Sequence, residues 1–387
     1  MAFASSHRAC AAAVVIVAIA TSSIGACSFR DLGDLTGGDA AVPVDSALAC
    51  AKDCLGGACI KGKCQPVTLI NGRASPWGIA VDNGDVYWSE ISVPGVAGAV
   101  YKFVPGDVPR KIVLTDVDPM WLFIDQGRLY WTSMTYPFAI GRCPLGGVGC
   151  VFHPGGSTSP RGSIVASGVG GTAYVNSPDR VVADSTGVYW TNAGSTVASR
   201  NGSIVVCRAT GCGSPPPQLL ALYQSRPRGI AIDDTYVYWV NEGLGVGGSD
   251  GTVRRIRKTG GIAETLADRQ PSPAYVAVDA TNLYWTNVGN GVGDGAVMYL
   301  AKSGGTPQVF AAGQDGAWDI AVDASGVYWS TFGASGAIST CPSTGCADGV
   351  TVLSAQSEAF GIALDDTAIY WTTNDPSTGA VMKLAKP

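Results

Sequence analysis

The chain has 387 residues, of which 46% are apolar and 14% charged, and its 25 basic against 30 acidic residues give a net charge of −5. Glycine accounts for 52 of the 387 residues, nearly twice the usual share of about 7%. This abundance predicts many turns and few helices. This balance offers no basic face for nucleic acid, so no nucleic-acid partner is expected.

Residues 1–26 have the layout of a secretory leader. Arg8 provides a positive charge, residues 9–20 form an apolar run too short for a stable membrane span, and small residues follow. Ile24-Gly25-Ala26-Cys27 resembles the lipobox of bacterial lipoproteins, whose cysteine is acylated and becomes the mature N-terminus. The resemblance therefore implies lipidation at Cys27.

The residue after Cys27 bears on the destination of the chain. Ser28 at this position resembles the pattern that directs Gram-negative lipoproteins to the outer membrane, facing either the periplasm or the cell surface. No second apolar run of membrane length follows, so the lipid is the only membrane contact expected. The alternative is ordinary signal-peptidase cleavage near Ala26, which would release a free exported protein.

Residues 27–49, rich in Gly, Ala, Asp and Ser, are predicted to form a flexible tether. Residues 50–64 then hold four closely spaced cysteines: Cys50, Cys54, Cys59 and Cys64. An exported chain favours two disulfides in a small knot, with three connectivities open. Zinc binding is the alternative, but the spacing lacks a CxxC pair.

Residues 65–387 contain one repeated sequence motif, which we call the phrase. It consists of an apolar run ending in Asp, then four turn residues, then Tyr-Trp. The Asp and Tyr positions are Asp82/Tyr87, Asp125/Tyr130, Asp184/Tyr189, Asp233/Tyr238, Asp279/Tyr284, Asp323/Tyr328 and Asp365/Tyr370. Successive Asp residues are 43, 59, 49, 46, 44 and 42 positions apart. A period of this length accommodates four short strands, which predicts a β-propeller.

The two ends of the repeat region predict how the ring closes. The sequence stops at residues 382–387, directly after the third strand of the seventh repeat. The seventh repeat therefore lacks its fourth, outer strand. Residues 66–70, which precede the first repeat, have the pattern of that missing strand. We therefore expect an all-β, seven-bladed propeller of four-stranded blades, closed by an N-terminal strand that completes the last blade. A six-bladed ring with one degenerate repeat is the competing count.

Each repeated residue has a structural explanation. Neighbouring residues in a strand point to opposite faces, so Tyr87 and Trp88 are expected to pack against different neighbouring blades. The carboxylate of Asp82 is expected to bond the backbone of its own turn.

Six further cysteines form three close pairs, each just after a third strand: Cys143/Cys150, Cys207/Cys212 and Cys341/Cys346. Each pair is predicted to form a disulfide across the hairpin that leads to the outer strand. Such short loops gain little chain entropy, so these bridges are expected to clip exposed hairpins.

The five residues Val188-Tyr189-Trp190-Thr191-Asn192 resemble the YWTD repeats of receptor propellers and related bacterial repeat domains. The resemblance covers residues 66–387 and implies a propeller. Where YWTD has Asp, this chain has Glu90, Ser133, Asn192, Asn241, Asn287, Thr331 and Thr373. The receptor propellers have six blades, so neither blade count nor ligands carry over. With its leader and Cys-Gly segment, the whole layout resembles bacterial lipoproteins that carry a Tyr-Trp propeller.

Catalytic signatures are sparse. His153 is the single histidine after the leader, which makes a Ser-His-Asp triad or a histidine metal site improbable. Loops after the second strands carry oxygen ligands of the type calcium prefers: Asn241, Glu242, Asp250, Asn287, Asn290, Asp294, Asn374 and Asp375. No enzyme activity and no cofactor are expected; a calcium-dependent hydrolase or lactonase in the channel is the alternative.

Three tryptophans outside the phrase, Trp77, Trp121 and Trp318, all stand at the entry to a first strand. The corresponding positions in the other blades are Arg180, Arg228, Tyr275 and Phe360. Because the innermost strand of a blade starts at the channel mouth, these side chains predict an aromatic and arginine ring there. Exposed Trp, Tyr and Arg are typical of binding hot spots. The hypothesis is a monomeric, non-catalytic scaffold that binds an envelope protein or glycan; packing between blades is the alternative.

Overall fold

The computed structural model describes residues 50 and 52–387 except 95, 116–117, 134, 136–137, 147–149, 153–162, 168–174, 196–199, 209–215, 246–248, 290–292 and 376–377. Only the backbone is described at 114–115, 150–152, 163–164 and 167. The leader, Cys27, the tether, His153, Cys212 and Asn290 lie outside the described residues. Within them, no helix is long and apolar enough to cross a membrane.

The cysteine knot is a small hairpin stapled at its base. Strands β1 (Cys59–Ile60) and β2 (Lys63–Cys64) pair through a turn in which Lys61 and Gly62 both have positive φ, 51° and 74°. Disulfides join Cys50 to Cys59 and Cys54 to Cys64, which decides between the three connectivities. The predicted Cys341–Cys346 bridge is also present, and Cys143 and Cys207 are disulfide-bonded.

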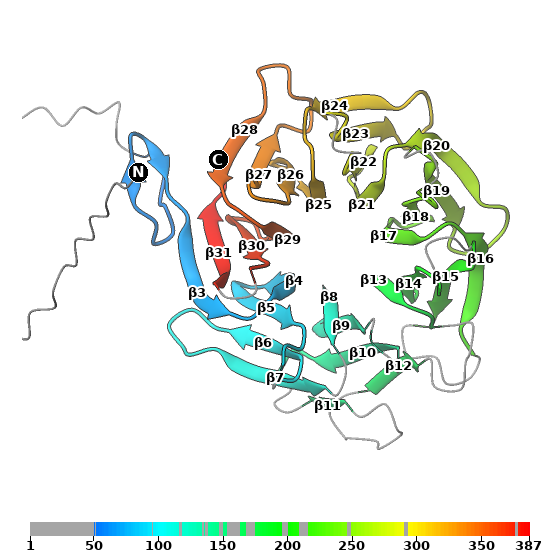
Figure 1. Cartoon of the computed structure of the whole chain (residues 1–387), viewed down its shortest axis with the longest axis horizontal. Coiled ribbons are helices and arrows are strands. Elements are labelled where there is room, and N and C mark those ends of the chain that lie inside the picture. Colours follow the sequence, from blue (N-terminus) through cyan, green and yellow to red (C-terminus); the bar gives the residue numbers. More distant parts are fainter. Residues whose placement is uncertain are drawn as a thin grey trace, which may run out of the picture. The chain divides into compact units, whose positions relative to one another are not determined.

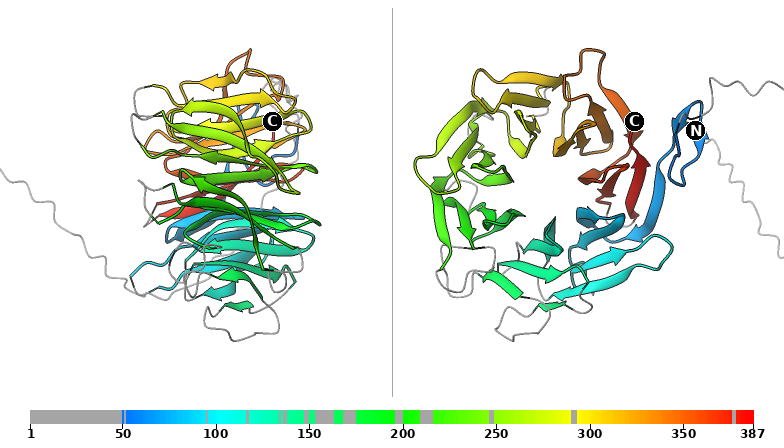
Figure 2. Two further views of the ribbon diagram at one scale, coloured as in Figure 1. Left: turned by 90° about the vertical axis from the view of Figure 1, so that its right-hand side faces the viewer. Right: turned by 180° about the vertical axis from the view of Figure 1, so that it is seen from behind.

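The described residues from Val67 onward form seven sheets, each with four antiparallel strands, arranged as blades around a central axis (Figure 1, Figure 2). We call the end of this axis at the start of the innermost strands the channel mouth. Blade 1 has β4 (Pro76–Asp82), β5 (Asp85–Glu90), β6 (Ala99–Phe103) and β7 (Arg110–Thr115). Blade 2 has β8 (Pro119–Asp125), β9 (Arg128–Ser133), β10 (Ala139–Pro144) and β12 (Ser163–Ser167). Blade 3 has β13 (Pro178–Ala183), β14 (Val188–Asn192), β15 (Gly202–Cys207) and β16 (Gln218–Gln224). Blade 4 has β17 (Pro227–Ile232), β18 (Tyr236–Asn241), β19 (Gly251–Arg257) and β20 (Glu264–Gln270).

The ring continues in the same pattern. Blade 5 has β21 (Pro273–Val278), β22 (Asn282–Asn287), β23 (Ala296–Ala301) and β24 (Gln308–Ala312). Blade 6 has β25 (Ala317–Asp323), β26 (Gly326–Thr331), β27 (Ala337–Cys341) and β28 (Thr351–Ala355). Blade 7 has β29 (Ala359–Leu364), β30 (Ala368–Thr373), β31 (Gly379–Ala385) and β3 (Val67–Arg73).

The predicted closure of the ring is confirmed. Strand β3 pairs antiparallel with β31, from Val67 opposite Lys383 to Arg73 opposite Gly379. Blade 7 is therefore built from two distant parts of the sequence, and the six-bladed count is wrong.

One strand was not expected. β11 (Cys150–Phe152) follows blade 2's third strand but pairs parallel with β7 on the outer edge of blade 1. The outer strand of blade 2 is β12, which comes later in the chain. The prediction that Cys143 and Cys150 flank a simple hairpin within one blade is therefore wrong, because the segment between the strands crosses to the neighbouring sheet.

The repeated aromatics fill the seams between blades as predicted. Tyr87 of blade 1 lies in one cluster with Trp131 of blade 2, whereas Trp88 lies in another with Tyr370 of blade 7. A Tyr packs with the Trp of the next blade in the same way at each of the five remaining seams. Burying side chains of this size stabilises each seam by roughly 1.5–3 kcal/mol per residue.

The repeated aspartates hold their turns as predicted. Asp233 accepts hydrogen bonds from the backbone N–H groups of Thr235 and Tyr236, both at 2.8 Å, and from the Tyr238 hydroxyl at 2.9 Å. Lys302 of the next blade lies 2.9 Å from the same carboxylate. Burial opposes ionisation, but these donors together lower the pKa of Asp233 to about 2.

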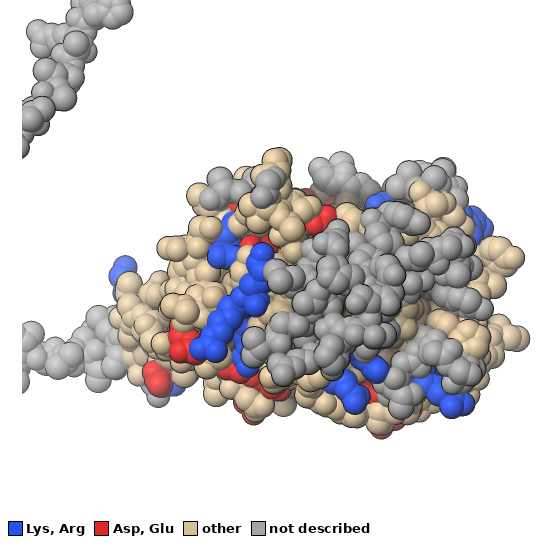
Figure 3. Space-filling model, turned by 90° about the horizontal axis from the view of Figure 1, so that it is seen from below, with Lys and Arg blue, Asp and Glu red and all other residues tan. Residues whose placement is uncertain are grey.

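The outer surface carries charges of both signs. On the face shown in Figure 3, basic and acidic side chains lie close to one another. In blade 1, Lys102 pairs with Asp85 at 2.6 Å and Arg110 with Asp107 at 3.0 Å.

Candidate functional site: the channel mouth

The channel mouth is shaped by a bulge at the start of each innermost strand. In blade 1 the ladder shifts between Pro76 and Ile79, which leaves Trp77 and Gly78 outside the regular pairing with β5. The same shift occurs in all seven blades. The two bulged residues are therefore the ones available to project into the mouth.

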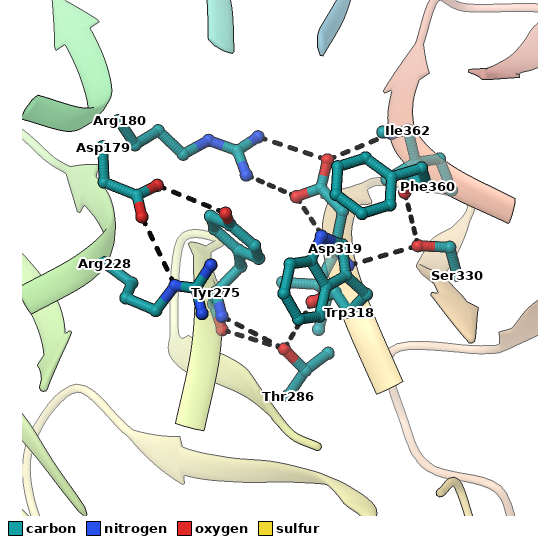
Figure 4. A network of polar contacts seen from close by, with 12 residues as sticks. Asp179, Arg180, Arg228, Tyr275, Thr286, Trp318, Asp319, Ser330, Phe360 and Ile362 are labelled. Carbon is teal, nitrogen blue, oxygen red and sulfur yellow. Dashed lines mark hydrogen bonds and ion pairs between the residues drawn. The ribbon is translucent and has the colours of Figure 1, made fainter. Parts of the chain in front are cut away.

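A hydroxyl side chain accepts a hydrogen bond from the backbone N–H group that the bulge takes out of the strand ladder. The Gly78 N–H donates to Ser89 Oγ at 2.9 Å, and Ser89 in turn donates to the carbonyl of Met120 in blade 2. This link between neighbouring blades recurs through Thr132, Thr191, Thr286, Ser330 and Thr372. Figure 4 shows Thr286 and Ser330 bridging in this way.

Blade 4 is the exception, because Val240 stands where the other six blades have a hydroxyl. Sequence reasoning overlooked this position, although the signal was present: Ser or Thr follows Tyr-Trp in six of the seven phrases.

The bulges bring the predicted mouth residues into one cluster. Trp121 of blade 2 lies 4.7 Å from Tyr275 of blade 5 and 5.8 Å from Phe360 of blade 7, measured between ring centroids. Phe360 also contacts Trp77 at 4.4 Å and Trp318 at 5.2 Å. The cluster therefore joins side chains from opposite sides of the ring.

The cluster is less exposed than expected. Trp121, Tyr275 and Phe360 are 2%, 1% and 3% exposed, so the expectation of an exposed ring is wrong for these three. They pack against one another because aromatic side chains from bulges in different blades reach the same space. Trp77 and Trp318 remain partly exposed.

The two predicted arginines insert between these rings. Arg180 lies over Trp121 at 4.5 Å and over Tyr275 at 4.8 Å, and Arg228 lies over Trp318 at 4.8 Å. A guanidinium over a ring face is attracted by the ring quadrupole, more strongly where water is excluded.

Two buried aspartates balance the arginines, and sequence reasoning missed both. Asp319 accepts from Arg180 at 2.5 and 3.4 Å and from the Ile362 N–H at 3.0 Å. Asp179 lies 3.3 Å from Arg228 and accepts from the Tyr275 hydroxyl at 3.2 Å (Figure 4). The aspartates adjoin the predicted residues in sequence, but the pairs cross between blades, which periodicity does not reveal.

Glu242 extends this network toward solvent. Arg228 Nη1 donates to its carboxylate at 3.0 Å, and Arg226 donates at 3.0 Å. Three guanidiniums thus meet three carboxylates, and the network is close to electrically neutral.

Burial dominates the electrostatics of this network. It raises the pKa of the Asp179 carboxyl, which Arg228 only partly offsets. Burial also raises the pKa of the Tyr275 hydroxyl well above its ordinary value, with the Asp179 charge acting in the same direction. Tyr275 therefore remains a neutral donor to Asp179 at ordinary pH.

Phe332, which follows β26, adds an exposed aromatic that sequence reasoning missed. Its side chain is 43% exposed, and its ring lies 6.1 Å from Trp318 and 5.8 Å from Phe360. Its N–H donates to the Gly316 carbonyl at 2.8 Å. Gly316 has φ of +75°, and a Cβ there would lie 2.6 Å from the Phe332 oxygen, so glycine permits this approach. The residue has no counterpart in the repeated phrase that could have drawn attention to it.

Several of the predicted calcium ligands in the described part of the chain make other contacts. Asn241 donates to Gln224 at 3.0 Å, Glu242 is held by two arginines, and Asp250 accepts from the Leu244 N–H at 2.7 Å. In the described part of the chain, the one group of His, Cys, Asp or Glu with metal-ligand spacing is Cys50, Cys54 and Cys64. These sulfurs are in disulfides, so they are not free to hold zinc. Calcium binding stays the alternative hypothesis.

Comparison with known proteins adds information on the fold alone. No protein-family model matches the chain, and no curated protein matches it. Among solved structures, a chain of a nidogen–laminin complex is 20% identical over 59% of this chain and 77% of its own length, with a TM-score of 0.43. The computationally designed Ika8 protein is 12% identical, covering 81% of this chain and 98% of its own, with a TM-score of 0.51. The second likeness concerns the overall fold.

Proposed function

We propose that the chain is a non-catalytic binding module of the bacterial cell envelope. In this proposal a lipid at Cys27 holds it at the outer membrane, and the channel mouth binds an envelope protein or glycan. The binding surface consists of Trp77, Trp318 and Phe332, and we call it the mouth patch.

The observation that carries the proposal is the exposed Phe332 ring beside partly exposed Trp318. The Phe332 ring is in contact with two further aromatic rings. Aromatic residues that cluster at a surface are enriched at interaction sites.

The layer beneath the patch favours binding further. Trp121, Tyr275, Phe360 and the arginine–aspartate pairs are buried and hydrogen-bonded, so the patch rests on a rigid base. A pre-organised surface loses little conformational entropy when a partner docks. This favours a partner that contacts the mouth over one that must enter the channel.

The test uses protein carrying Cys27→Ala, immobilised and exposed to envelope extract and, separately, to a glycan array. Trp318→Ala with Phe332→Ala should remove the bound species. Ile262→Ala, which alters a side chain that is 93% exposed in blade 4, serves as the control. Retention of the same species by the double variant, with its fold verified by circular dichroism, would rule out the mouth patch as the site.

The anchoring part of the proposal has its own test. Bacterial cells expressing the chain are labelled with a radioactive fatty acid, and Cys27→Ala is compared with the unaltered sequence. Label in the unaltered chain alone supports lipidation, whereas label in neither places the chain among freely exported proteins. A stoichiometric calcium ion found by elemental analysis would direct attention to the hydrolase alternative.

A further inference from the structure

A second candidate site lies away from the mouth, between the cysteine knot and the outer edges of blades 6 and 7. Here a pocket of about 380 Å³ opens between the hairpin and the ends of β28 and β31. Figure 1 shows the hairpin beside these strands and outside the ring. The volume is within the range of about 300–1,000 Å³ typical of small-molecule pockets.

The wall of this pocket is apolar. Leu384 is buried, Leu353 and Cys64 pack against the same cluster, and Val352 completes the wall. Val352 is 56% exposed, although it borders a hydrophobic concavity. Apolar surface of this kind favours a hydrophobic ligand.

The pocket is also pre-formed. The disulfides Cys50–Cys59 and Cys54–Cys64 fix the hairpin that forms one side, and the propeller sheets form the other. Neither side has to fold around a ligand, so little ordering entropy opposes binding.

Two lysines of the pocket lining outnumber the one carboxylate there, that of the last residue Pro387. Lys52 and Lys63 line the pocket, both are exposed, and neither forms an ion pair within the described residues. Asp53, the acidic neighbour of Lys52, accepts the Leu55 N–H at 2.9 Å. The whole chain has a net charge of −5, whereas two positively charged lysines lie together at this pocket. This local positive charge suits an anionic group.

We propose that this pocket binds a single-chain anionic amphiphile, such as a fatty acid. The acyl chain lies against Val352, Leu353 and Leu384, and the carboxylate lies between Lys52 and Lys63. This inference is independent of the mouth patch, since it uses other residues and another part of the ring.

The test measures binding of dodecanoate, below its micelle concentration, to the full chain carrying Cys27→Ala by calorimetry. Dodecyl maltoside offers the same tail with a neutral head, and acetate offers the carboxylate without the tail. We expect dodecanoate to bind at least tenfold more tightly than either. Equal binding of dodecyl maltoside would overturn the role of the lysines, and equal binding of acetate would overturn the role of the apolar wall.

Variants locate the site. Val352→Asp places a negative charge in the wall and should weaken dodecanoate binding by more than tenfold. Val309→Asp is the matched control, because Val309 has the same place in the outer strand of blade 5 and is 57% exposed. Lys52→Gln with Lys63→Gln should weaken dodecanoate binding about tenfold without affecting dodecyl maltoside. No detectable dodecanoate binding, or equal loss in the two aspartate variants, would refute the proposal.

Discussion

Arg180 of blade 3 and Asp319 of blade 6 form an ion pair across the channel, joining blades that do not touch along a seam. Seams between neighbours hold every blade to the next, but this contact ties opposite sides of the ring. The mouth therefore acts as one unit.

Removing the carboxylate should expose the cost of a buried charge. Asp319→Asn leaves the Arg180 guanidinium without its counter-ion, and we expect the free energy of unfolding to fall by about 3–5 kcal/mol. The exposed pair Arg110–Asp107 provides the control, since Asp107→Asn should cost less than about 1 kcal/mol. Equal effects of the two substitutions in denaturant titrations would contradict a buried pair.

The lowered pKa of Asp233 predicts acid sensitivity with a definite sign. Its folded value of about 2 lies below the ordinary 3.8, so its ionised form stabilises the fold above the ordinary value and this contribution is lost as pH falls toward 2. Melting temperatures measured from pH 5 to pH 2 should therefore fall less steeply for Asp233→Asn than for the unaltered chain. Parallel curves would show that the carboxylate has no such role.

The missing hydroxyl in blade 4 predicts a stabilising substitution. Val240→Thr would complete the set of links between neighbouring blades and should raise the free energy of unfolding by about 1 kcal/mol. Thr286→Val, the reverse change in blade 5, removes the bonds to Trp318 and Tyr275 and should lower it by about 1–3 kcal/mol. If Val240→Thr instead lowers the free energy of unfolding, the new hydroxyl has no hydrogen-bond partner. The seam between blades 4 and 5 would then differ from the other six.

Close approach of neighbouring bulges makes one glycine hard to replace. A Cβ on Gly78 would lie 2.3 Å from the backbone oxygen of Met120, so Gly78→Ala should cost about 1–3 kcal/mol and disturb the mouth. Gly146→Ala is the control, because no atom of the described residues lies within 4 Å of a Cβ there and its φ is not left-handed. Similar denaturation midpoints for both variants would argue against tight packing at this point.

Sequence reasoning was most successful where the repeat itself carries the information. The fixed Asp-x4-Tyr-Trp spacing predicts the blades, the opposite faces of Tyr87 and Trp88, and the turn that Asp233 holds, because each is a local consequence of strand geometry. The closure by β3 could be predicted as well, because an incomplete last blade needs a partner strand.

The mouth was only partly predictable. Its aromatic and arginine residues stand at the two bulged positions that open each innermost strand. Their burial follows from contacts such as Trp121 with Tyr275, between blades that are not adjacent. Repeat periodicity says nothing about such cross-channel pairs. β11 escaped prediction for a related reason, since a strand of three residues pairs with a sheet other than the one that precedes it.

The pairing of β3 with β31 also constrains how the molecule forms. Strand β3 lies at the start of the repeat region and β31 at its end, so blade 7 forms only after nearly all of the repeats have been synthesised. Until then β3 has no partner strand in its own chain, and it is able to pair with any β31 strand in reach, including that of a second copy. Productive folding therefore depends on closure within one chain being faster than an encounter between two chains. Strand exchange competes when the concentration of newly made chains is high.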